Sequence, residues 1–459
     1  MTVKIINQSL LSRLWAMSWP TVLYSLLESS VGLVDIFFAS YLGSEAVAAI
    51  GFSRQIFLVL MIGTLSITTG TITLVSQYCG AKRYDAASSI ASHSLLLSIS
   101  SGLFIGFIGV FLARYSLILL GAEANALYEG TNYLQVLMGG VVFLMIGFST
   151  NGVFRALGDA YTPLKIATLV NALNILFSYV FIFGFGPIPA YGVMGAAIGT
   201  VLARIFGSSL AVYMLMRKSR QVRITLHEGF SLSIVKQILD IGLPSGFSGF
   251  FRNGARVLFF RIIATTSAGS VAVAVATIGF QLRMLNIMPA LAFQVATATL
   301  VGQCIGAKKI DQAEAYGWTA IKFCSSIMAA ASLLILIFPG FIMRIFSDSI
   351  QVIEMGIFAL RLLALEQFCN SVSIIVSGAL SGAGDTKPSL RYTILSQWLL
   401  MLPLAYWLSN TSLDISGAWI AWGFAPIIQT FLTLRRFIKG AWKKMHASGV
   451  VGVVDELAD

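Results

Sequence analysis

The chain has 459 residues, of which 57% are hydrophobic and 11% are charged. Soluble domains carry about 25% charged residues, so this composition excludes a soluble globular protein and indicates an integral membrane protein. The formal charge is +11, but no basic and aromatic stripe lies outside the apolar segments, so we expect no nucleic-acid partner. The four cysteines and three histidines show no metal-ligand or disulfide spacing.

About 20 apolar residues span a bilayer as a helix, and the chain contains twelve such segments. The alternating pattern of a membrane β-barrel is missing. The sequence therefore predicts an all-α integral membrane protein with twelve transmembrane helices. In chain order they lie at roughly 13–40, 48–77, 88–115, 131–154, 162–184, 191–216, 237–264, 272–303, 317–343, 352–380, 389–408 and 415–437.

Two stretches of the chain are nearly the same. Residues 73–87 read TLVSQYCGAKRYDAA and residues 299–313 read TLVGQCIGAKKIDQA, and Gly-Asp at 158–159 recurs at 384–385. Self-similarity at half the chain length indicates a duplicated structural unit, and such duplication is common among membrane transporters.

The repeat predicts two pseudo-symmetric lobes of six helices each, in the same orientation across the membrane. The expected boundaries are 1–216 for the N-lobe, 217–236 for a cytoplasmic linker, 237–440 for the C-lobe and 441–459 for a cytoplasmic tail. Lys and Arg concentrate in alternate loops and in both tails. Since these residues mark the cytoplasmic side, we expect both termini in the cytoplasm of a multi-pass protein of the cell (inner) membrane.

Three acidic residues lie deep within predicted spans: Glu28, Asp35 and Glu366. An ionisable group inside a bilayer costs at least a few kcal/mol, so each is a functional hypothesis by default. Glu28 precedes Asp35 by seven residues, which places both on one helical face. Two carboxylates on one wall can bind a cation or a proton, and the alternative for each is a buried structural hydrogen bond.

Polar and small residues also line the fifth and sixth predicted spans. Asn171, Asn174 and Ser178 form a stripe in 162–184, and Ala196 and Thr200 follow four residues apart in the next span. Amide, hydroxyl and backbone oxygens beside an aspartate can complete the shell of a hard cation. The alternative is close packing between helices, which small and polar residues also favour in membranes.

Several motifs occur in order along the chain: P-x14-D with AVAAIGF, the Q-x-x-G-A-K-x-x-D-x-A loop in both halves, RALGDAYTP, NALNILFSYVFIFG, GVMGAAIGT and GLP. With these motifs the chain resembles, over nearly its whole length, the multidrug and toxic compound extrusion (MATE) family. The resemblance implies two six-helix lobes that alternate between inward-open and outward-open states. It also implies export of small amphipathic organic compounds or drugs, driven by a gradient of H⁺ or Na⁺.

Carried over to this sequence, Asp35 matches the acid of the family's N-lobe site, with Asn174, Ala196 and Thr200 as its partners. The chain thus resembles the branch with an N-lobe acidic site. Many members have a second aspartate where this sequence has Ser178. One carboxylate fewer favours a proton, unless Glu28 supplies the missing charge. The alternative is Na⁺ bound by Asp35, Asn174 and Thr200.

The C-lobe departs further from the family pattern. Some members carry a glutamate where this chain has Arg252, and an aspartate and a tyrosine where it has Asn370 and Glu366. An unpaired arginine in a bilayer is costly. We therefore expect Arg252 to pair with Glu366, or alternatively with Glu28 across the lobes. Arg256 lies one turn further on, and an anionic substrate is implied if both arginines face the cavity.

The sequence thus favours an ion-coupled efflux antiporter that works by alternating access. The alternative is a flippase of a lipid-linked or anionic substrate, moved through an arginine-lined cavity. We expect no enzyme, because paired acidic metal-binding motifs are missing, and we expect that ATP is not the energy source, because the Walker A sequence is missing. Apart from the coupling ion H⁺ or Na⁺ we expect no cofactor, and we expect a monomer.

Overall fold

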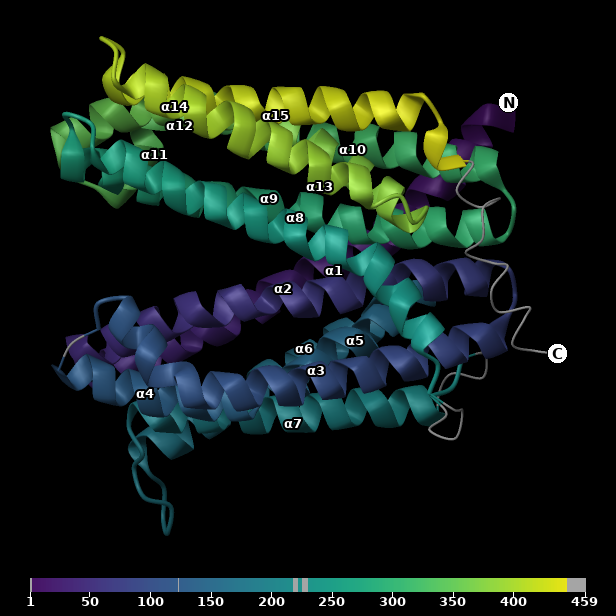
Figure 1. The fold of residues 1–459 in the computed structure, drawn as a ribbon, viewed down its shortest axis with the longest axis horizontal. Helices are drawn as coiled ribbons and strands as arrows, with labels where there is room; N and C mark the ends of the chain where they lie inside the picture. The colour runs from purple at the N-terminus through teal and green to yellow at the C-terminus, as the bar shows by residue number, and fades with distance from the viewer. Residues whose placement is uncertain (1, 123, 218–221, 225–229, 444–459) are drawn as a thin grey trace. The chain divides into compact units, whose positions relative to one another are not determined.

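The computed structural model describes residues 2–122, 124–217, 222–224 and 230–443, and these residues are almost all helical (Figure 1). They form no β-sheet; a single bridge joins Phe185 to Ile188 in the turn after residue 183. The prediction of an all-α chain is confirmed.

Each of the twelve predicted segments is helical. The first six correspond to α1 (Thr2–Ser40), α2 (Ser44–Gly80), α3 (Tyr84–Leu119), the pair α4 (Ala124–Gly139) and α5 (Val141–Ala156), α6 (Tyr161–Phe183) and α7 (Val193–Arg217). The second six correspond to α8 (Leu232–Ala264), α9 (Gly269–Gly306), α10 (Ile310–Ile337) with α11 (Pro339–Phe346), α12 (Ile350–Gly382), the run α13 (Lys387–Thr393), η1 (Ile394–Met401) and α14 (Leu402–Ser409), and α15 (Asp414–Ile438). Among the described residues, seven helices are long and apolar enough to cross a membrane alone, and α4–α5, bent by 46°, makes an eighth.

The chain divides into two compact units. The N-unit is Pro20–Gly246, and the C-unit joins Met1–Trp19 to Phe247–Asp459. Both α1 and α8 therefore pass from one unit to the other, and each does so within a few residues of an internal proline, Pro20 or Pro244. Proline removes a backbone hydrogen bond inside a helix and kinks it, so these are the natural points for such a crossing.

The two compact units differ from the two lobes predicted from the sequence repeat in α1 and α8, the helices that pass from one unit to the other. In the C-unit, Leu10, Leu14 and Met17 of α1 are buried with Ile287 and Phe293 of α9. The repeat assigns the start of α1 to the N-lobe, whereas its side chains pack in the other unit.

The first half of α8 is correspondingly packed in the N-unit, against α2. A Cβ atom at Gly70 would lie 2.2 Å from the carbonyl oxygen of Ile238, and one at Gly242 would lie 2.0 Å from that of Ser66. Real Cβ contacts are not that short, so glycine at these two positions lets the two backbones touch.

The described parts of the linker are held on α3. The backbone N–H of Arg223 donates to Ser88 Oγ at 2.9 Å, and the N–H of Ser231 donates to Nε2 of the buried His93 at 2.9 Å. The predicted linker and tail also include residues outside the described part of the chain, namely 218–221, 225–229 and 444–459.

Candidate coupling site

The predicted acid Asp35 lies on α1, inside the N-unit, and is 2% exposed. Tyr133 of α4 donates its hydroxyl to Asp35 Oδ2 at 2.9 Å, and Thr200 of α7 donates to both carboxylate oxygens at 3.3 and 3.2 Å. Hydrogen bonds to a carboxylate are stronger than those between neutral groups. Asp35 is thus held by two hydroxyl groups, and no ion pair to it occurs among the described residues.

Sequence reasoning missed Tyr133. It begins an apolar segment without any polar spacing that would distinguish it from a packing residue. The available signal was only that a buried tyrosine hydroxyl usually finds a hydrogen-bond partner. In the structure it is 4% exposed and that partner is Asp35.

Asn174 of α6 extends the site beyond the carboxylate. Its Nδ2 donates to Thr200 Oγ1 at 2.8 Å and to Ser178 Oγ at 3.3 Å. Its Oδ1 is buried and has no hydrogen-bond partner among the described residues. Buried polar atoms almost always have a partner, so this oxygen is the free acceptor of the site.

Small residues bring α6 and α7 close enough for these contacts. A Cβ at Gly195 would lie 2.3 Å from the Phe181 carbonyl oxygen, and one at Gly199 would lie 2.5 Å from the Ser178 nitrogen. Thr200 follows Gly199 directly, so the close approach sets its distance from Asn174. Ala196 is fully buried in an apolar cluster, and its methyl group serves packing.

Asn171 is held away from the carboxylate. Its Oδ1 accepts from Ser30 Oγ at 2.6 Å, and its Nδ2 donates to the Ala167 carbonyl oxygen at 2.9 Å. The residue therefore connects α6 to α1 about one and a half turns from Asp35. This contact between helices is the alternative role that the sequence left open for the polar stripe.

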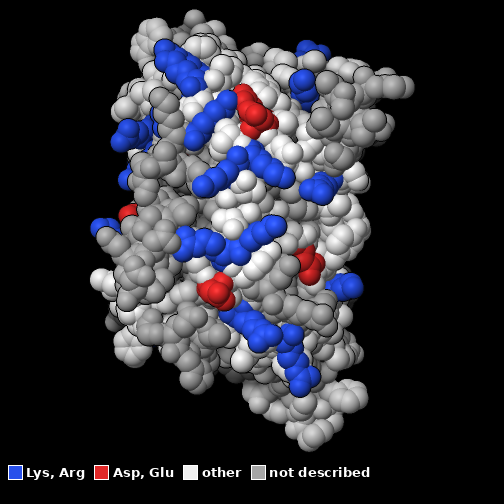
Figure 2. All heavy atoms as spheres, turned by 90° about the vertical axis from the view of Figure 1, so that its right-hand side faces the viewer, with Lys and Arg blue, Asp and Glu red and all other residues white. Residues whose placement is uncertain are grey.

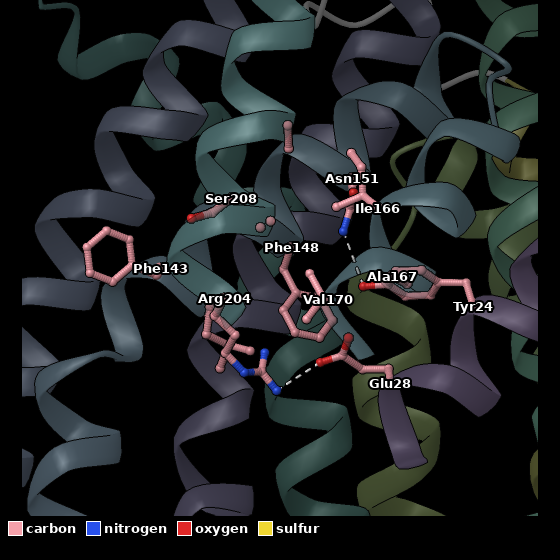
Figure 3. A pocket seen from close by; sticks show the side chains of 14 residues that line it. Tyr24, Glu28, Phe143, Phe148, Asn151, Ile166, Ala167, Val170, Arg204 and Ser208 are labelled. Atoms are coloured by element: carbon pink, nitrogen blue, oxygen red, sulfur yellow. Dashed lines mark hydrogen bonds and ion pairs between the residues drawn. The ribbon is translucent and has the colours of Figure 1, made fainter. Parts of the chain in front are cut away.

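Glu28 is paired with an arginine of its own unit. Arg204 Nη2 lies 3.1 Å from Glu28 Oε1, and Figure 3 shows the two side chains pointing toward each other beside a small cavity. Arg204 lies one turn after Thr200 on α7, so α7 contacts both predicted carboxylates of α1. The partner of Glu28 in the structure is therefore Arg204 and not Arg252.

The buried acid of the C-unit, Glu366 on α12, is 1% exposed. Arg283 of α9 binds it with both arms: Nη2 lies 3.0 Å from Oε1 and Nε lies 3.1 Å from Oε2. The predicted Arg252–Glu366 pair is wrong, because the carboxylate is already engaged by Arg283. Arg283 was missed from the sequence, because residue type alone does not distinguish it from Arg252 or Arg256 as a partner of Glu366.

A family model described as MatE matches residues 20–180 and 244–407. The chain belongs to the MATE family. It is 29% identical over 440 residues to the probable multidrug resistance protein NorM of Thermotoga maritima, an alignment that covers 93% of this chain and 91% of the relative. It is also 26% identical over 433 residues to the uncharacterized transporter YisQ of Bacillus subtilis, which covers 94% of both chains.

Solved MATE structures share the whole fold. The crystal structure of a MATE protein in the bent conformation superposes with a TM-score of 0.89 at 26% identity, and covers 97% of this chain and 99% of that one. A MOP superfamily transporter from Pyrococcus furiosus, whose reversed pocket polarity is reported to suggest a different function, gives 0.87 at 27% identity, with coverage of 95% and 96%. The predictions of the MATE family, of its two-lobed helical fold and of a transporter rather than an enzyme are confirmed.

Three predicted site residues of this MATE protein lie in the C-unit without a partner among the described residues that defines their role: Arg252, Arg256 and Asn370. Arg252 and Arg256 of α8 are half-buried, and neither forms an ion pair with a described residue. Asn370 is buried one turn after Glu366. The C-unit thus presents two uncompensated guanidinium groups where the N-unit presents a carboxylate.

Proposed function

We propose that this MATE protein exports small amphipathic organic compounds or drugs in exchange for protons, by alternating access. The observation that carries the proposal is Asp35: a buried carboxylate with hydroxyl donors only, beside the free oxygen of Asn174. A buried charge without a counter-ion is costly, so the site gains from binding a proton or a cation. The substrate class is supported by relatives whose printed names call them probable multidrug resistance proteins.

Two features favour H⁺ over Na⁺ as the coupling ion. Both oxygens of Asp35 already accept hydrogen bonds from Tyr133 or Thr200, so a metal ion would have to displace donors. This chain has Ser178 at the position where many family members have a second aspartate, and one carboxylate fewer favours a proton over Na⁺. If Na⁺ did bind, its ligands would be Asp35, Thr200 and Asn174 Oδ1, whose oxygen chemistry suits a hard cation.

The mechanism follows from the contacts of α1. Ionised Asp35 holds α1 against α4 through Tyr133 and against α7 through Thr200. Protonation from outside removes the charge that strengthens both bonds, so α1 can shift and the substrate is released. The proton drives this change only as far as it binds the two conformations with different affinity.

We propose the orientation with both termini and both Gly-Ala-Lys loops in the cytoplasm of the cell membrane. Figure 2 shows many more Lys and Arg than Asp and Glu on the face that it draws. Lys and Arg accumulate on cytoplasmic loops, and this distribution supports the assignment.

The test is drug efflux from vesicles, wild type beside Asp35→Asn, with H⁺ and Na⁺ gradients imposed separately. We expect H⁺-driven efflux that the variant loses, with no response to Na⁺ alone. Asp348→Asn, at an exposed position, is the matched control. H⁺-driven efflux that survives in Asp35→Asn would contradict the proposal, and Na⁺-driven efflux would replace H⁺ by Na⁺ at the same site.

One observation favours a second candidate function, the transfer of a lipid-linked or anionic substrate. Arg252 and Arg256 carry charge in a membrane helix without an ion-pair partner in the described chain, and an anionic headgroup would neutralise them. If Arg252→Gln/Arg256→Gln abolishes movement of an anionic lipid analogue in vesicles and leaves cationic drug efflux intact, this second function is supported.

A further inference from the structure

A row of polar side chains continues from Asp35 along one face of α1. Glu28 and Tyr24 follow at spacings of seven and four residues, which places all three on the same side of the helix. Each reaches a different neighbour: Glu28 pairs with Arg204, and the Tyr24 hydroxyl accepts from Asn151 Nδ2 at 3.3 Å. The row therefore leads away from Asp35, through the interior of the N-unit, toward α5.

A cavity of about 40 Å³ lies beside the Glu28 and Tyr24 end of this row. Its polar lining comes from Tyr24, Glu28, Asn151, Arg204 and Ser208, and Figure 3 shows these side chains grouped around it. One water needs about 10–15 Å³ of such volume and two to four polar partners, so the cavity has room for roughly three waters. The rest of the lining carries no polar side chain, so the polar residues are where water can bind.

Two further residues continue the row to the end of α5. Asn151 Oδ1 is buried without a partner in the described chain, and so are Nε and Nη2 of Arg155, a residue only 8% exposed. The Arg155 guanidinium lies 4.3 Å from the centre of the Tyr24 ring. Buried atoms of this kind need hydrogen-bond partners, which water reaching them from the cavity can supply.

We propose that this row is the route by which protons leave the Asp35 site, with Glu28 as the relay residue. The inference rests on the proposed function, because it assumes that Asp35 exchanges protons. One proton moves in each step: the O–H bond on Asp35 breaks as an O–H bond forms on water, the Glu28 carboxylate takes that proton, and it then returns it to water on the Tyr24–Asn151 side. No other bond changes.

The charges around the cavity explain why a carboxylate is needed there. Arg204 of α7 and Arg155 of α5 both repel an approaching proton, and Tyr24 is neutral. The lining from α6 is Ile166, Ala167 and Val170, which carry no charge. Among the described residues, Glu28 is the only acidic side chain that lines the cavity, so it offsets the arginines and offers a place for the proton.

The direction of the route agrees with the proposed orientation. Arg155 lies in the last turn of α5, next to the turn at Gly158, on the side that we assign to the cytoplasm. Asp35 would thus take a proton from outside and release it inward through Glu28, which is the direction that an exporter needs.

The experiment uses the full chain in proteoliposomes with a pH dye inside and a fluorescent drug. Glu28→Gln/Arg204→Gln removes both charges of the pair and leaves neither buried alone, and Asn151→Leu blocks the polar path. We expect H⁺-driven transport to fall on the order of 10- to 100-fold in each, since a positioned proton-transfer group contributes about 100-fold or more. Drug–drug exchange, which moves no net proton, should stay within about 2-fold of wild type.

Glu354→Gln on α12 and Tyr115→Phe on α3, both exposed, are the matched controls, and Glu28→Asp should restore part of the H⁺-driven rate. H⁺-driven transport at the wild-type rate in the double variant and in Asn151→Leu would overturn the relay, provided that Asp35→Asn is inactive in the same assay. An equal fall of exchange and H⁺-driven transport would also overturn it, because the residues would then be merely structural. Activity in Asp35→Asn would instead refute the proposed function.

Discussion

Each unit of the protein buries an acidic side chain within a long apolar helix, Asp35 in α1 and Glu366 in α12, yet the two units treat that carboxylate in opposite ways. In the N-unit, Asp35 receives hydroxyl groups from Tyr133 and Thr200. In the C-unit, Glu366 is bound by both arms of the Arg283 guanidinium. The first carboxylate keeps an uncompensated charge and can exchange a proton, while the second is neutralised permanently, since arginine does not lose its proton in proteins. Burial alone therefore does not make a carboxylate a coupling site. Whether its hydrogen-bond donors are neutral hydroxyl groups or a charged guanidinium decides whether it can exchange a proton.

The largest expected effects separate these two carboxylates. Glu366→Gln leaves the partly buried Arg283 without its counter-ion and should destabilise the protein by about 3 kcal/mol, at the low end of the cost of breaking a buried pair. Asp35→Asn keeps its shape and breaks no ion pair, so it should leave unfolding nearly unchanged while it abolishes H⁺-driven efflux. Thermal unfolding in detergent and vesicle transport measure the two effects. The double variant Glu366→Gln/Arg283→Gln should recover most of the lost stability, and failure to do so would contradict a structural role for the pair.

The sequence was sufficient to predict the helices and much of the N-unit site. The length and hydrophobicity of a segment predict an apolar helix directly, and helical spacing places Asn174 and Ser178 on one face of their helix. That these residues and Thr200 lie beside Asp35 was implied only by the resemblance to the MATE family. Tyr133 was not predicted, because a single aromatic residue in an apolar span belongs to no polar pattern that would mark it as functional.

The C-unit shows the limit of such reasoning. Arg252, Arg256 and Arg283 are all plausible partners for Glu366 by residue type, and choosing among them requires the rotation of α8 and α9 about their axes. The crossing of α1 and α8 between the units was equally hidden, because a sequence repeat records the duplication of a helix and not which neighbours each half of it packs against.

A second prediction tests the backbone that brings the N-unit donors together. Gly199→Ala would place a methyl group 2.5 Å from the Ser178 nitrogen, which forces α6 and α7 apart and separates Asn174 from Thr200. We expect a loss of about 1–3 kcal/mol in stability, as for other overpacked sites, together with impaired efflux. Gly51→Ala on α2 is the matched control, because open space surrounds that position. Equal stability of the two variants would show that the close approach is unimportant.

The third prediction concerns the donor that sequence reasoning missed. Tyr133→Phe removes one hydroxyl from Asp35 and should cost about 1.5–3 kcal/mol of the interaction with the ionised carboxylate. H⁺-driven efflux should fall less than in Asp35→Asn, because Thr200 still donates. Tyr115→Phe removes a hydroxyl from an exposed tyrosine on α3 and should have no effect in the same assay. An unchanged rate in Tyr133→Phe would remove this residue from the coupling site.

The fourth prediction extends the comparison to the repeated Gly-Asp turns. Gly158 and Gly384 have nearly the same positive φ, 87° and 84°, but the aspartates that follow them bind different partners. Asp159 accepts from the backbone N–H of Thr162 at 2.9 Å at the start of α6, whereas Asp385 is 1% exposed and binds Arg436 through both oxygens.

Replacing the two aspartates should therefore have unequal consequences. Asp159→Ala loses a helix-capping contact, worth about 1 kcal/mol. Asp385→Ala loses a charged pair whose arginine is partly exposed, and we expect about 2–3 kcal/mol. Unfolding temperatures of the two variants measure the difference. Equal destabilisation would mean that the two halves still use this turn in the same way; a larger loss for Asp385→Ala would show that duplication preserved the backbone turn while the carboxylate acquired a new partner in the second half.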